Sequence, residues 1–295
     1  MYKYINYFRI NLNKQIIHNL VKKIFSEKIH KILYYIFKTR IYDLHPRSIG
    51  KIFIKKILNK KTYVKHNNKI LFSIRDYGDG TKSRADQFFS KNSEIETINW
   101  ILSFEPNSNF LDVGANIGLF SLFAAKKNHN VISIEPESHN FTILNLNIFD
   151  NKLNDKIICY PISIASKNKL SKLNIYKMGW GHSMHSFNSE IKIGGDIKKS
   201  VFKQGSFGMS LDEVIEQTQF FPDYIKIDVD GNELDVIYGF SKFLSSKKIK
   251  SIMIEIDPYD IESKDKIINY MSKYLFRVDF EISTKSNYFF KKQGY

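Results

Sequence analysis

Short runs of consecutive apolar residues alternate with helix-like patterns through the second half of the chain. The runs predict strands at 109–113, 130–135, 156–162, 224–229 and 251–256. Between them, apolar residues three or four apart predict helices. These helices lie at 116–127, around Phe141, Leu144 and Ile148, and around Leu234, Ile237, Phe240 and Leu244. Continuously apolar strands separated by helices are typical of a parallel sheet covered on both faces.

The C-terminal end follows a different pattern. "LFRVDF" and "NYFFKK" are two further strand candidates, and only a short polar turn around Ser283–Ser286 joins them. A connection this short gives an antiparallel pair, because a parallel crossover needs about a dozen residues or more. We therefore expect an α/β fold, a Rossmann-like seven-stranded and mostly parallel sheet whose last strand is antiparallel.

Two elements precede this sheet. Residues 62–75 predict a hairpin that turns near Asn67 and Asn68. "NSEIETINWILSF" predicts a short helix with Ser93 as its N-cap and Glu96 three residues later. We therefore divide the chain into a basic helical extension at 1–60, a hairpin-and-helix lead-in at 61–107, and a main domain at 108–295.

Positive charge is concentrated at the N-terminus. The chain carries a net charge of +15, and residues 1–60 hold 14 lysines and arginines against two acidic residues. Residues 12–38 have a basic amphipathic pattern, which suits an anionic membrane surface. Packing on the rest of the protein or on a second subunit would use the same apolar stripe. The abundance of Lys, Asn and Ile throughout, as under an AT-rich genome, explains part of the charge but not its segregation.

The cysteine content and the length of the apolar runs bear on where in the cell the protein is located. Cys159 is the only cysteine, so no internal disulfide forms, which fits a reducing cytosol. Its apolar neighbours predict a packed core thiol. No apolar run reaches about 18 residues, and the N-terminus lacks the pattern of a signal peptide. We expect a cytoplasmic protein, peripheral at the inner membrane face if residues 12–38 bind lipid.

The stretch "FLDVGANIGLFS", at 110–121, marks the candidate site. Gly114 allows a sharp turn and close approach to a ligand, and Gly118 leaves room where the next helix crosses the strand. Amides at the start of that helix favour a carboxylate or a phosphate. Glu135, at the tip of the second strand, can accept hydrogen bonds from a ribose diol. These residues predict a nucleoside-bearing cofactor, either a nicotinamide dinucleotide or S-adenosylmethionine.

The spacing distinguishes the two cofactors. The dinucleotide fingerprint G-x-G-x-x-G needs a glycine where this chain has Asn116, so the approach of a pyrophosphate is obstructed. The carboxylate of Asp112 would repel a pyrophosphate, but it suits the ammonium and sulfonium groups of S-adenosylmethionine. We therefore expect S-adenosylmethionine, bound by Asp112, Gly114, Asn116, Gly118 and Glu135.

Four stretches together resemble the FkbM-type family of S-adenosylmethionine-dependent methyltransferases: "FLDVGANIGLFS", "VISIEPESHNF", "SLDEVI" and "DYIKIDVDGNELDVIYG". The resemblance implies a class I methyltransferase fold and O-methylation of hydroxyls on sugars, as in polysaccharide biosynthesis, or on secondary metabolites. It also implies that Asp228 lies close to the cofactor and that Ile164 and Ser166 meet the adenine. The chain departs from the family at residues 1–60 and in a loop at 177–208.

Methyl transfer to an alcohol needs a group that takes the proton of the acceptor. The loop "GWGHSMHSFN", at 179–188, supplies two histidines that titrate near neutral pH. The same loop would also be compatible with an exposed segment that has no chemical role. The candidate catalytic residues are Asp228, His182 and His185.

A divalent metal is an alternative aid to the chemistry. Asp228, Asp230 and Asp257 are carboxylates at the tips of neighbouring strands, and Mg²⁺ prefers such ligands. Asp230 or Asn232 would equally serve as the N-cap of the following helix. We interpret the Asp257-Pro258-Tyr259 stretch as a strand-ending turn.

Three functions are compatible with these features. The first is an O-methyltransferase acting on a sugar, glycan or secondary-metabolite hydroxyl. The second is an RNA methyltransferase, motivated by the basic segment; however, that segment is apolar-striped and no RNA-binding module is recognisable, so we expect no nucleic-acid partner. The third is a non-catalytic module of the same fold, bound to a membrane or a partner.

Overall fold

The computed structural model describes residues 59–295 except 68, 91–93, 194–195 and 295. Residues 59–295 form one compact unit. The predicted basic helices at 12–38 and the predicted N-cap Ser93 lie outside the described residues. None of the described helices is long and apolar enough to cross a membrane.

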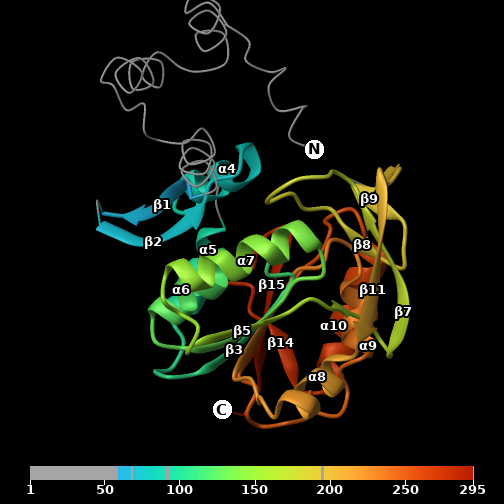
Figure 1. The fold of residues 1–295 in the computed structure, drawn as a ribbon. Coiled ribbons are helices and arrows are strands. Elements are labelled where there is room, and N and C mark those ends of the chain that lie inside the picture. Colours follow the sequence, from blue (N-terminus) through green and yellow to red (C-terminus); the bar gives the residue numbers. More distant parts are fainter. Residues whose placement is uncertain (1–58, 68, 91–93, 194–195, 295) are drawn as a thin grey trace, which may run out of the picture. The chain divides into compact units, whose positions relative to one another are not determined.

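A seven-stranded sheet forms the centre of this unit (Figure 1). Its order is β14 (Phe276–Val278), β15 (Asn287–Lys292), β13 (Ser251–Glu255), β12 (Tyr224–Ile227), β3 (Asn109–Val113), β4 (Asn130–Ile134) and β5 (Ile157–Tyr160). The five strands from β13 to β5 are parallel, and β15 is antiparallel to both of its neighbours. The short polar turn therefore joins an antiparallel pair, as predicted.

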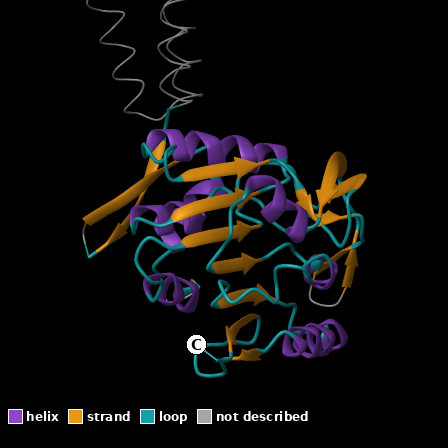
Figure 2. Ribbon diagram, turned by 90° about the horizontal axis from the view of Figure 1, so that it is seen from below, coloured by secondary structure: helices purple, strands orange, loops and turns teal. Residues whose placement is uncertain are grey.

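Helices cover both faces of the sheet (Figure 2). One apolar core includes Ile98, Leu122 and Leu144, from α5 (Ile95–Leu102), α6 (Leu119–Lys126) and α7 (Ser138–Asp150). The other core includes Val214, Ile237 and Ile267, from α8 (Leu211–Thr218), α9 (Glu233–Tyr238) and α10 (Ile261–Lys273). Burial on both faces explains why the parallel strands are apolar at nearly every position.

Some predicted boundaries were wrong. Helix α6 begins at Leu119 instead of residue 116, because residues 114–118 form a turn with positive φ angles at Gly114, Asn116 and Gly118. Helix α9 ends at Tyr238, so the apolar stripe continues beyond the helix. Phe240 and Leu244 are nevertheless fully buried. The N-cap position of α5 is occupied by Glu94.

The predicted hairpin is present as β1 (Lys61–His66) and β2 (Lys69–Arg75). Helix α7 holds it through Asn147, whose Oδ1 accepts the Arg75 amide at 2.8 Å, and through an ion pair between Arg75 and Asp150. The short helix α4 (Asp79–Gln87) follows the hairpin. It was not predicted, and it carries Arg84 to the site described below.

The segment expected as a loop at 177–208 contributes to a second sheet. This sheet has the order β6 (Ser163–Ile164), β11 (Phe202–Met209), β7 (Lys169–Ile175) and β8 (Ser186–Phe187). A further pair, β9 (Ile191–Ile193) and β10 (Asp196–Lys198), lies between β8 and β11 in the chain. The two long strands of this sheet, β7 and β11, mix buried with exposed positions, so they lack the continuous apolar runs of the central sheet.

Candidate functional site

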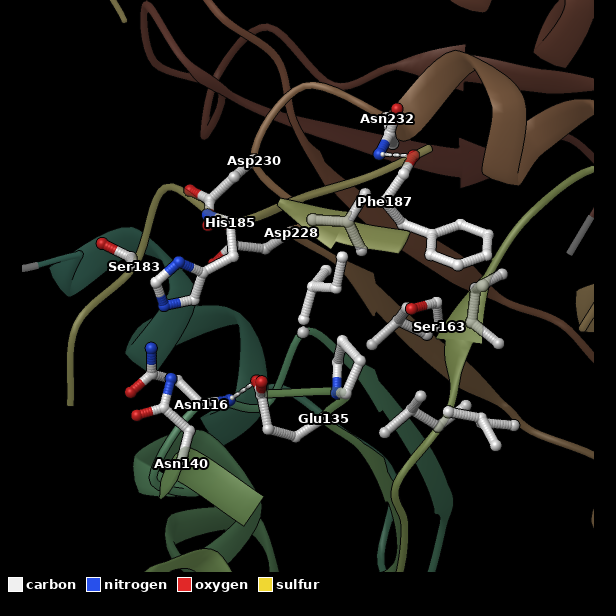
Figure 3. Close-up of a pocket in the computed structure, with 18 of the residues that line it drawn as sticks. Asn116, Glu135, Asn140, Ser163, Ser183, His185, Phe187, Asp228, Asp230 and Asn232 are labelled. Carbon is white, nitrogen blue, oxygen red and sulfur yellow. Dashed lines mark hydrogen bonds between the residues drawn. The ribbon is translucent and has the colours of Figure 1, made fainter. Parts of the chain in front are cut away.

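A cavity lies beyond the carboxyl ends of β3, β4 and β12 (Figure 3). Two kinds of side chain line it. The polar ones are Arg84, Asn116, Glu135, Asn140, Ser163, Ser183, His185, Asp228, Asp230 and Asn232, and the apolar ones include Ile134, Ile162, Ile164, Leu173 and Phe187. Figure 3 shows Asn116, Asn140, Ser183, His185 and Asp230 on one side, and Ser163 and Phe187 on the other. The cavity therefore has a polar end and a more apolar end.

Gly114 brings the turn after β3 against the end of β12. Its φ is +81°, and a Cβ at this position would lie 1.7 Å from the backbone oxygen of Asp228. The amide of Gly114 donates to the carbonyl of Ile134 at 2.9 Å, which also ties the turn to β4. Only glycine combines this conformation with this close approach.

Glu135 stands at the end of β4, as predicted, and lines the cavity. Its Oε2 accepts the backbone amide of Asn116 at 2.7 Å, and its Oε1 accepts that of Glu137 at 2.8 Å. Burial raises the pKa of this carboxyl to about 8, although the two amides lower it. Beyond these two bonds, the carboxyl can still accept from a ligand hydroxyl and, when protonated, can donate to one.

Asp228, another predicted residue, lines the cavity above a buried lysine. The Nζ of Lys226 donates to Oδ2 of Asp228 at 2.6 Å, and Lys226 is 1% exposed. Burial alone would raise the pKa of Asp228, but Lys226 and a hydrogen bond with Glu255 lower it. The neighbouring Asp228 charge, together with burial, raises the pKa of Glu255. Asp228 is thus held ionised, and Glu255 is held protonated beside it.

Three predicted cofactor residues do not line the cavity. Asp112 is 1% exposed and accepts a hydrogen bond from Ser121 of α6, so its carboxyl lies beneath the turn. Gly118 serves the packing of α6 on α7, because a Cβ there would lie 2.3 Å from Cδ1 of Leu144. Ser166 follows β6 and lies against the backbone of Gly239. Ile164, which the resemblance implies together with Ser166, does line the cavity, as does Ser163.

Residues 180–185 form a strap that is fixed by side chains from several elements. Nε of Arg84 donates to the carbonyl of Gly181 at 2.7 Å. The amide of Gly181 donates to Oδ1 of Asn140 at 2.8 Å. The carbonyl of His182 accepts from Asn116 and from Asn140, at 2.9 and 2.8 Å. The strap therefore couples α4, α7 and the turn after β3 to one edge of the cavity.

The two predicted histidines have different surroundings. His185 lines the cavity and is 8% exposed, whereas His182 does not line it. Burial lowers the pKa of both, so both are neutral at pH 7. Nδ1 of His185 accepts the amide of Tyr176 at 3.4 Å, which places the ring proton on Nε2. Nε2 is buried without a partner among the described residues, so it is an available hydrogen-bond donor at the cavity.

Asp230 holds the other end of the strap and does not cap a helix. Its Oδ2 accepts the amides of Met184 and His185 at 2.7 and 3.3 Å. Asn232 is at the N-cap position of α9, without a side-chain capping bond. Burial, and then the Asp228 charge, raise the pKa of Asp230 to about 7. Asp230 is therefore a cavity carboxyl that titrates near neutral pH.

The three-aspartate metal site is not formed. Asp257 does not line the cavity, and its Oδ1 accepts the amide of Tyr259 at 2.9 Å within the predicted strand-ending turn. Over residues 59–295, with the gaps given above, no group of three or more His, Cys, Asp or Glu side chains is arranged to hold a metal ion. The predicted ligand set is therefore wrong.

Several important residues were missed from the sequence. Arg84 and Asn140 line the cavity, and Lys226 and Glu255 set the charge of Asp228. Lys226 does leave a signal, since it is a lysine inside the apolar strand "YIKI". A charge at such a position predicts a buried ionic partner. Arg84 leaves none, because it belongs to a polar helix outside the resembling stretches.

A family model and a curated relative both identify this chain as similar to methyltransferases. Residues 112–278 match the family model described as the methyltransferase FkbM domain. Methyltransferase sdnD of Sordaria araneosa is 24% identical over 180 residues, which cover 52% of this chain and 68% of that protein. Among solved structures, methyltransferase FkbM from Methylobacillus flagellatus KT is 16% identical, with a TM-score of 0.44, over 72% of this chain and 55% of that one. This chain thus spans little more than half of that protein. TYW2 of P. horikoshii, in complex with MeSAdo, is 14% identical, with a TM-score of 0.39, over 79% and 69% of the two chains.

Proposed function

The chain belongs to the FkbM methyltransferase domain family, since more than half of its residues match that family, and on this premise we propose that its cavity binds S-adenosylmethionine. We further propose that the enzyme transfers a methyl group to a hydroxyl oxygen of a sugar, a glycan or a secondary metabolite. The observation that carries the cofactor assignment is the position of Glu135, at the carboxyl edge of the sheet between the polar and apolar ends of one cavity.

The cavity residues fit both halves of this cofactor. Glu135 suits the ribose hydroxyls, and Ile134, Ile162 and Ile164 offer an apolar surface for a nucleobase. At the polar end, the ionised Asp228 suits an ammonium group. The Nη atoms of Arg84 make no hydrogen bond within the described part of the chain, and they suit a carboxylate. An amino acid joined to a nucleoside carries all of these groups.

Asn116 argues against a dinucleotide. Its amide donates to Glu135, its Nδ2 donates to His182, and its Oδ1 accepts the amide of Ile117 at 2.9 Å. The side chain is therefore fixed in the turn where a pyrophosphate would need a glycine. Displacement of this side chain by a ligand would cost its two side-chain hydrogen bonds.

The protein residues supply proton transfer and positioning. When bound, S-adenosylmethionine supplies a methyl group already activated on a sulfonium. Asp230, whose pKa is about 7, is the carboxyl suited to take the acceptor's proton. His185 donates from Nε2 and so orients a hydroxyl oxygen, instead of acting as the base. The strap at 180–185 excludes water from this edge of the cavity.

Calorimetric titration tests the cofactor assignment. The full chain should bind S-adenosylmethionine and S-adenosylhomocysteine, and an excess of NAD should not displace them. Transfer of a labelled methyl group to hydroxyl-bearing sugars then tests the reaction class. Binding of NAD in place of S-adenosylmethionine would overturn the cofactor assignment, and methylation of RNA alone would overturn the acceptor class.

A further inference from the structure

The second sheet has an uncovered outer face. Strands β7 and β11 pair so that Phe207 lies opposite Leu170, and Gly205 lies opposite Lys172. Their inner side chains, such as Leu173 and Ser206, are buried. On the outer face, Leu170 is 83% exposed and Phe207 is 37% exposed. The outer face comprises Leu170, Lys172, Lys203, Gly205 and Phe207.

Exposed apolar residues continue at the end of this sheet. Val201 lies beside β7, because its amide donates to the carbonyl of Ile175 at 2.8 Å. Val201 and the adjacent Phe202 are 65% and 51% exposed, and Ile197 of β10 is 63% exposed. Figures 1 and 2 both show this sheet at the opposite end of the unit from the β1–β2 hairpin. Apolar exposure concentrated in one region commonly marks an interaction surface.

This region is also strongly basic. Residues 167–203 hold eight lysines, no arginine and two acidic residues, a net charge of +6, whereas the rest of the chain from residue 61 carries −3. Five of the lysines are exposed and make no ion pair within the described part of the chain; they are Lys167, Lys172, Lys177, Lys199 and Lys203. Lys172 and Lys203 lie on the outer face itself, so an anionic partner would complement its charge.

The positive charge of the outer face argues against two other partners: a second copy of this chain, and residues 1–60 of the chain itself. A second copy meeting the first through the same face would place Lys172 and Lys203 near their own equivalents. Residues 1–60 carry +12 and would be repelled as well. Among anionic partners, exposed aliphatic side chains such as Leu170, Ile197 and Val201 favour lipid. Residues 167–203 contain no arginine, a residue on which nucleic-acid recognition commonly depends, and this argues against a nucleic-acid partner.

We propose that the outer face docks on an anionic lipid bilayer, with Leu170 and Phe207 entering the headgroup region and the lysines contacting acidic headgroups. This docking does not depend on the proposed function. It would, however, bring the cavity close to the membrane, because Leu173 and Phe187 of the same sheet line the cavity. An acceptor carried on a lipid would then be within reach.

A fluorescent label tests the contact directly. Cys159 is the only cysteine, so a Cys159→Ser, Leu170→Cys protein can carry one environment-sensitive dye at the outer face. Phe280, which is 78% exposed elsewhere, gives the matched control as Phe280→Cys. With vesicles containing phosphatidylglycerol, the dye at 170 should shift to shorter wavelength and be quenched by lipid-borne quenchers, whereas the dye at 280 should do neither. A dye at 170 that remains in water while the protein sediments with vesicles would overturn the proposal.

Charge variants supply an independent readout. The double variant Lys172→Glu, Lys203→Glu should weaken binding to the anionic vesicles at least about tenfold. The control is the double variant Lys247→Glu, Lys291→Glu, at two lysines that are exposed elsewhere. It should change vesicle binding less than about twofold. Calorimetric titration with S-adenosylmethionine should be the same for both pairs, so a failure of the cofactor assignment would be recognised separately. If the 172/203 pair weakens binding to an RNA oligonucleotide and leaves vesicle binding unchanged, the partner is RNA and the proposal is wrong.

Discussion

The backbone amide of Asn116 donates a 2.7 Å hydrogen bond to the carboxylate of Glu135. Asn116 belongs to the turn after β3, and Glu135 directly follows β4. This contact fixes the turn to the tip of the neighbouring strand. Asn116 also holds the strap through the carbonyl of His182. The proposed ribose acceptor, the glycine turn and the edge of the cavity are therefore parts of one hydrogen-bonded unit.

Removal of the Glu135 carboxyl should weaken cofactor binding. Glu135→Ala removes the ribose acceptor and the anchor of the Asn116 amide; a lost hydrogen bond costs about 0.5–1.5 kcal/mol, and a buried donor left unsatisfied costs about 1–3 kcal/mol. We expect the dissociation constant for S-adenosylmethionine to rise roughly 10- to 100-fold, measured by calorimetric titration. Glu262→Ala, at an exposed position on α10, is the control. Unaltered binding by Glu135→Ala would refute the cofactor assignment.

Burial of Glu135 should also make folding stability depend on pH. Its pKa rises from an ordinary value of 4.5 to about 8 in the folded protein. The folded state therefore holds a proton that the unfolded chain releases. This contribution to stability is complete below pH 4.5 and is lost as the pH rises toward 8. Urea unfolding at pH 5 and pH 8 should show a smaller difference for Glu135→Gln than for the wild type, by roughly 3 kcal/mol. An equal difference in both proteins would contradict the raised pKa.

Asp230 should control the pH dependence of catalysis. A carboxyl with a pKa of about 7 accepts a proton only when ionised, so kcat should rise with pH through about 7 and then level. Asp230→Asn should lower kcat about 100-fold or more and flatten the profile. The measurement is the initial rate of methyl transfer to the identified hydroxyl acceptor. An unchanged profile in Asp230→Asn would assign the base elsewhere.

Lys226 should be essential for stability. Lys226→Met would leave Asp228 without its buried cation, and breaking a buried ion pair costs about 3–5 kcal/mol. The exposed Lys247→Met should change the free energy of unfolding by less than about 0.5 kcal/mol. Adding Asp228→Asn to Lys226→Met should recover part of the loss, because the two side chains are coupled. Chemical denaturation should give the free energy of unfolding of the wild type, the two single variants and the double variant. If Lys226→Met lowers this free energy no more than Lys247→Met does, the pair of Lys226 and Asp228 is not stabilising.

Alanine substitutions at Gly114 and Gly231 should distinguish the cost of backbone strain from the cost of a steric clash. Both have positive φ angles, +81° and +100°. A Cβ at Gly231 meets no atom within 4 Å, whereas a Cβ at Gly114 would overlap the backbone of Asp228. Gly231→Ala should therefore cost about 1 kcal/mol, and Gly114→Ala should cost clearly more and abolish cofactor binding. Chemical denaturation should measure the stability of the two variants, and calorimetric titration should measure their binding of S-adenosylmethionine. Equal effects of the two substitutions would contradict the close approach of Gly114 to the Asp228 backbone.

The central sheet could be predicted because its strands are unusually uniform. Strands such as "NFLDV" and "NVISI" are buried on both faces, so their apolar runs are continuous and their limits are clear. The second sheet could not be predicted in this way. In β7, Leu170 and Lys172 face outward while Leu173 and Ile175 are buried, and the sequence pattern predicts no strand there. Strand β11 has a similarly mixed pattern, and most of it falls in the segment expected as a loop at 177–208.

The errors at the site have related causes. Asp112 and Gly114 are only two residues apart, but the Asp112 side chain lies under α6 and only Gly114 lines the cavity. Ile164 and Ser166 were both assigned by resemblance; the pairing of β6 with β11 places Ile164 at the cavity together with Ser163, but not Ser166. Arg84 reaches the cavity from α4, about thirty residues before the glycine turn.

By itself the sequence determined the strands of the central sheet and three of the helices between them, and it placed Gly114, Glu135 and Asp228 at the carboxyl edge of that sheet. These features follow from local apolar periodicity and from turn chemistry, which neighbouring residues encode. Only the tertiary structure decided which acids face the cavity, which histidine lines it and which carboxyl titrates near neutral pH. Burial and charge at a side chain depend on residues far away in the chain, such as Lys226 and Glu255 around Asp228, and no local pattern contains that information.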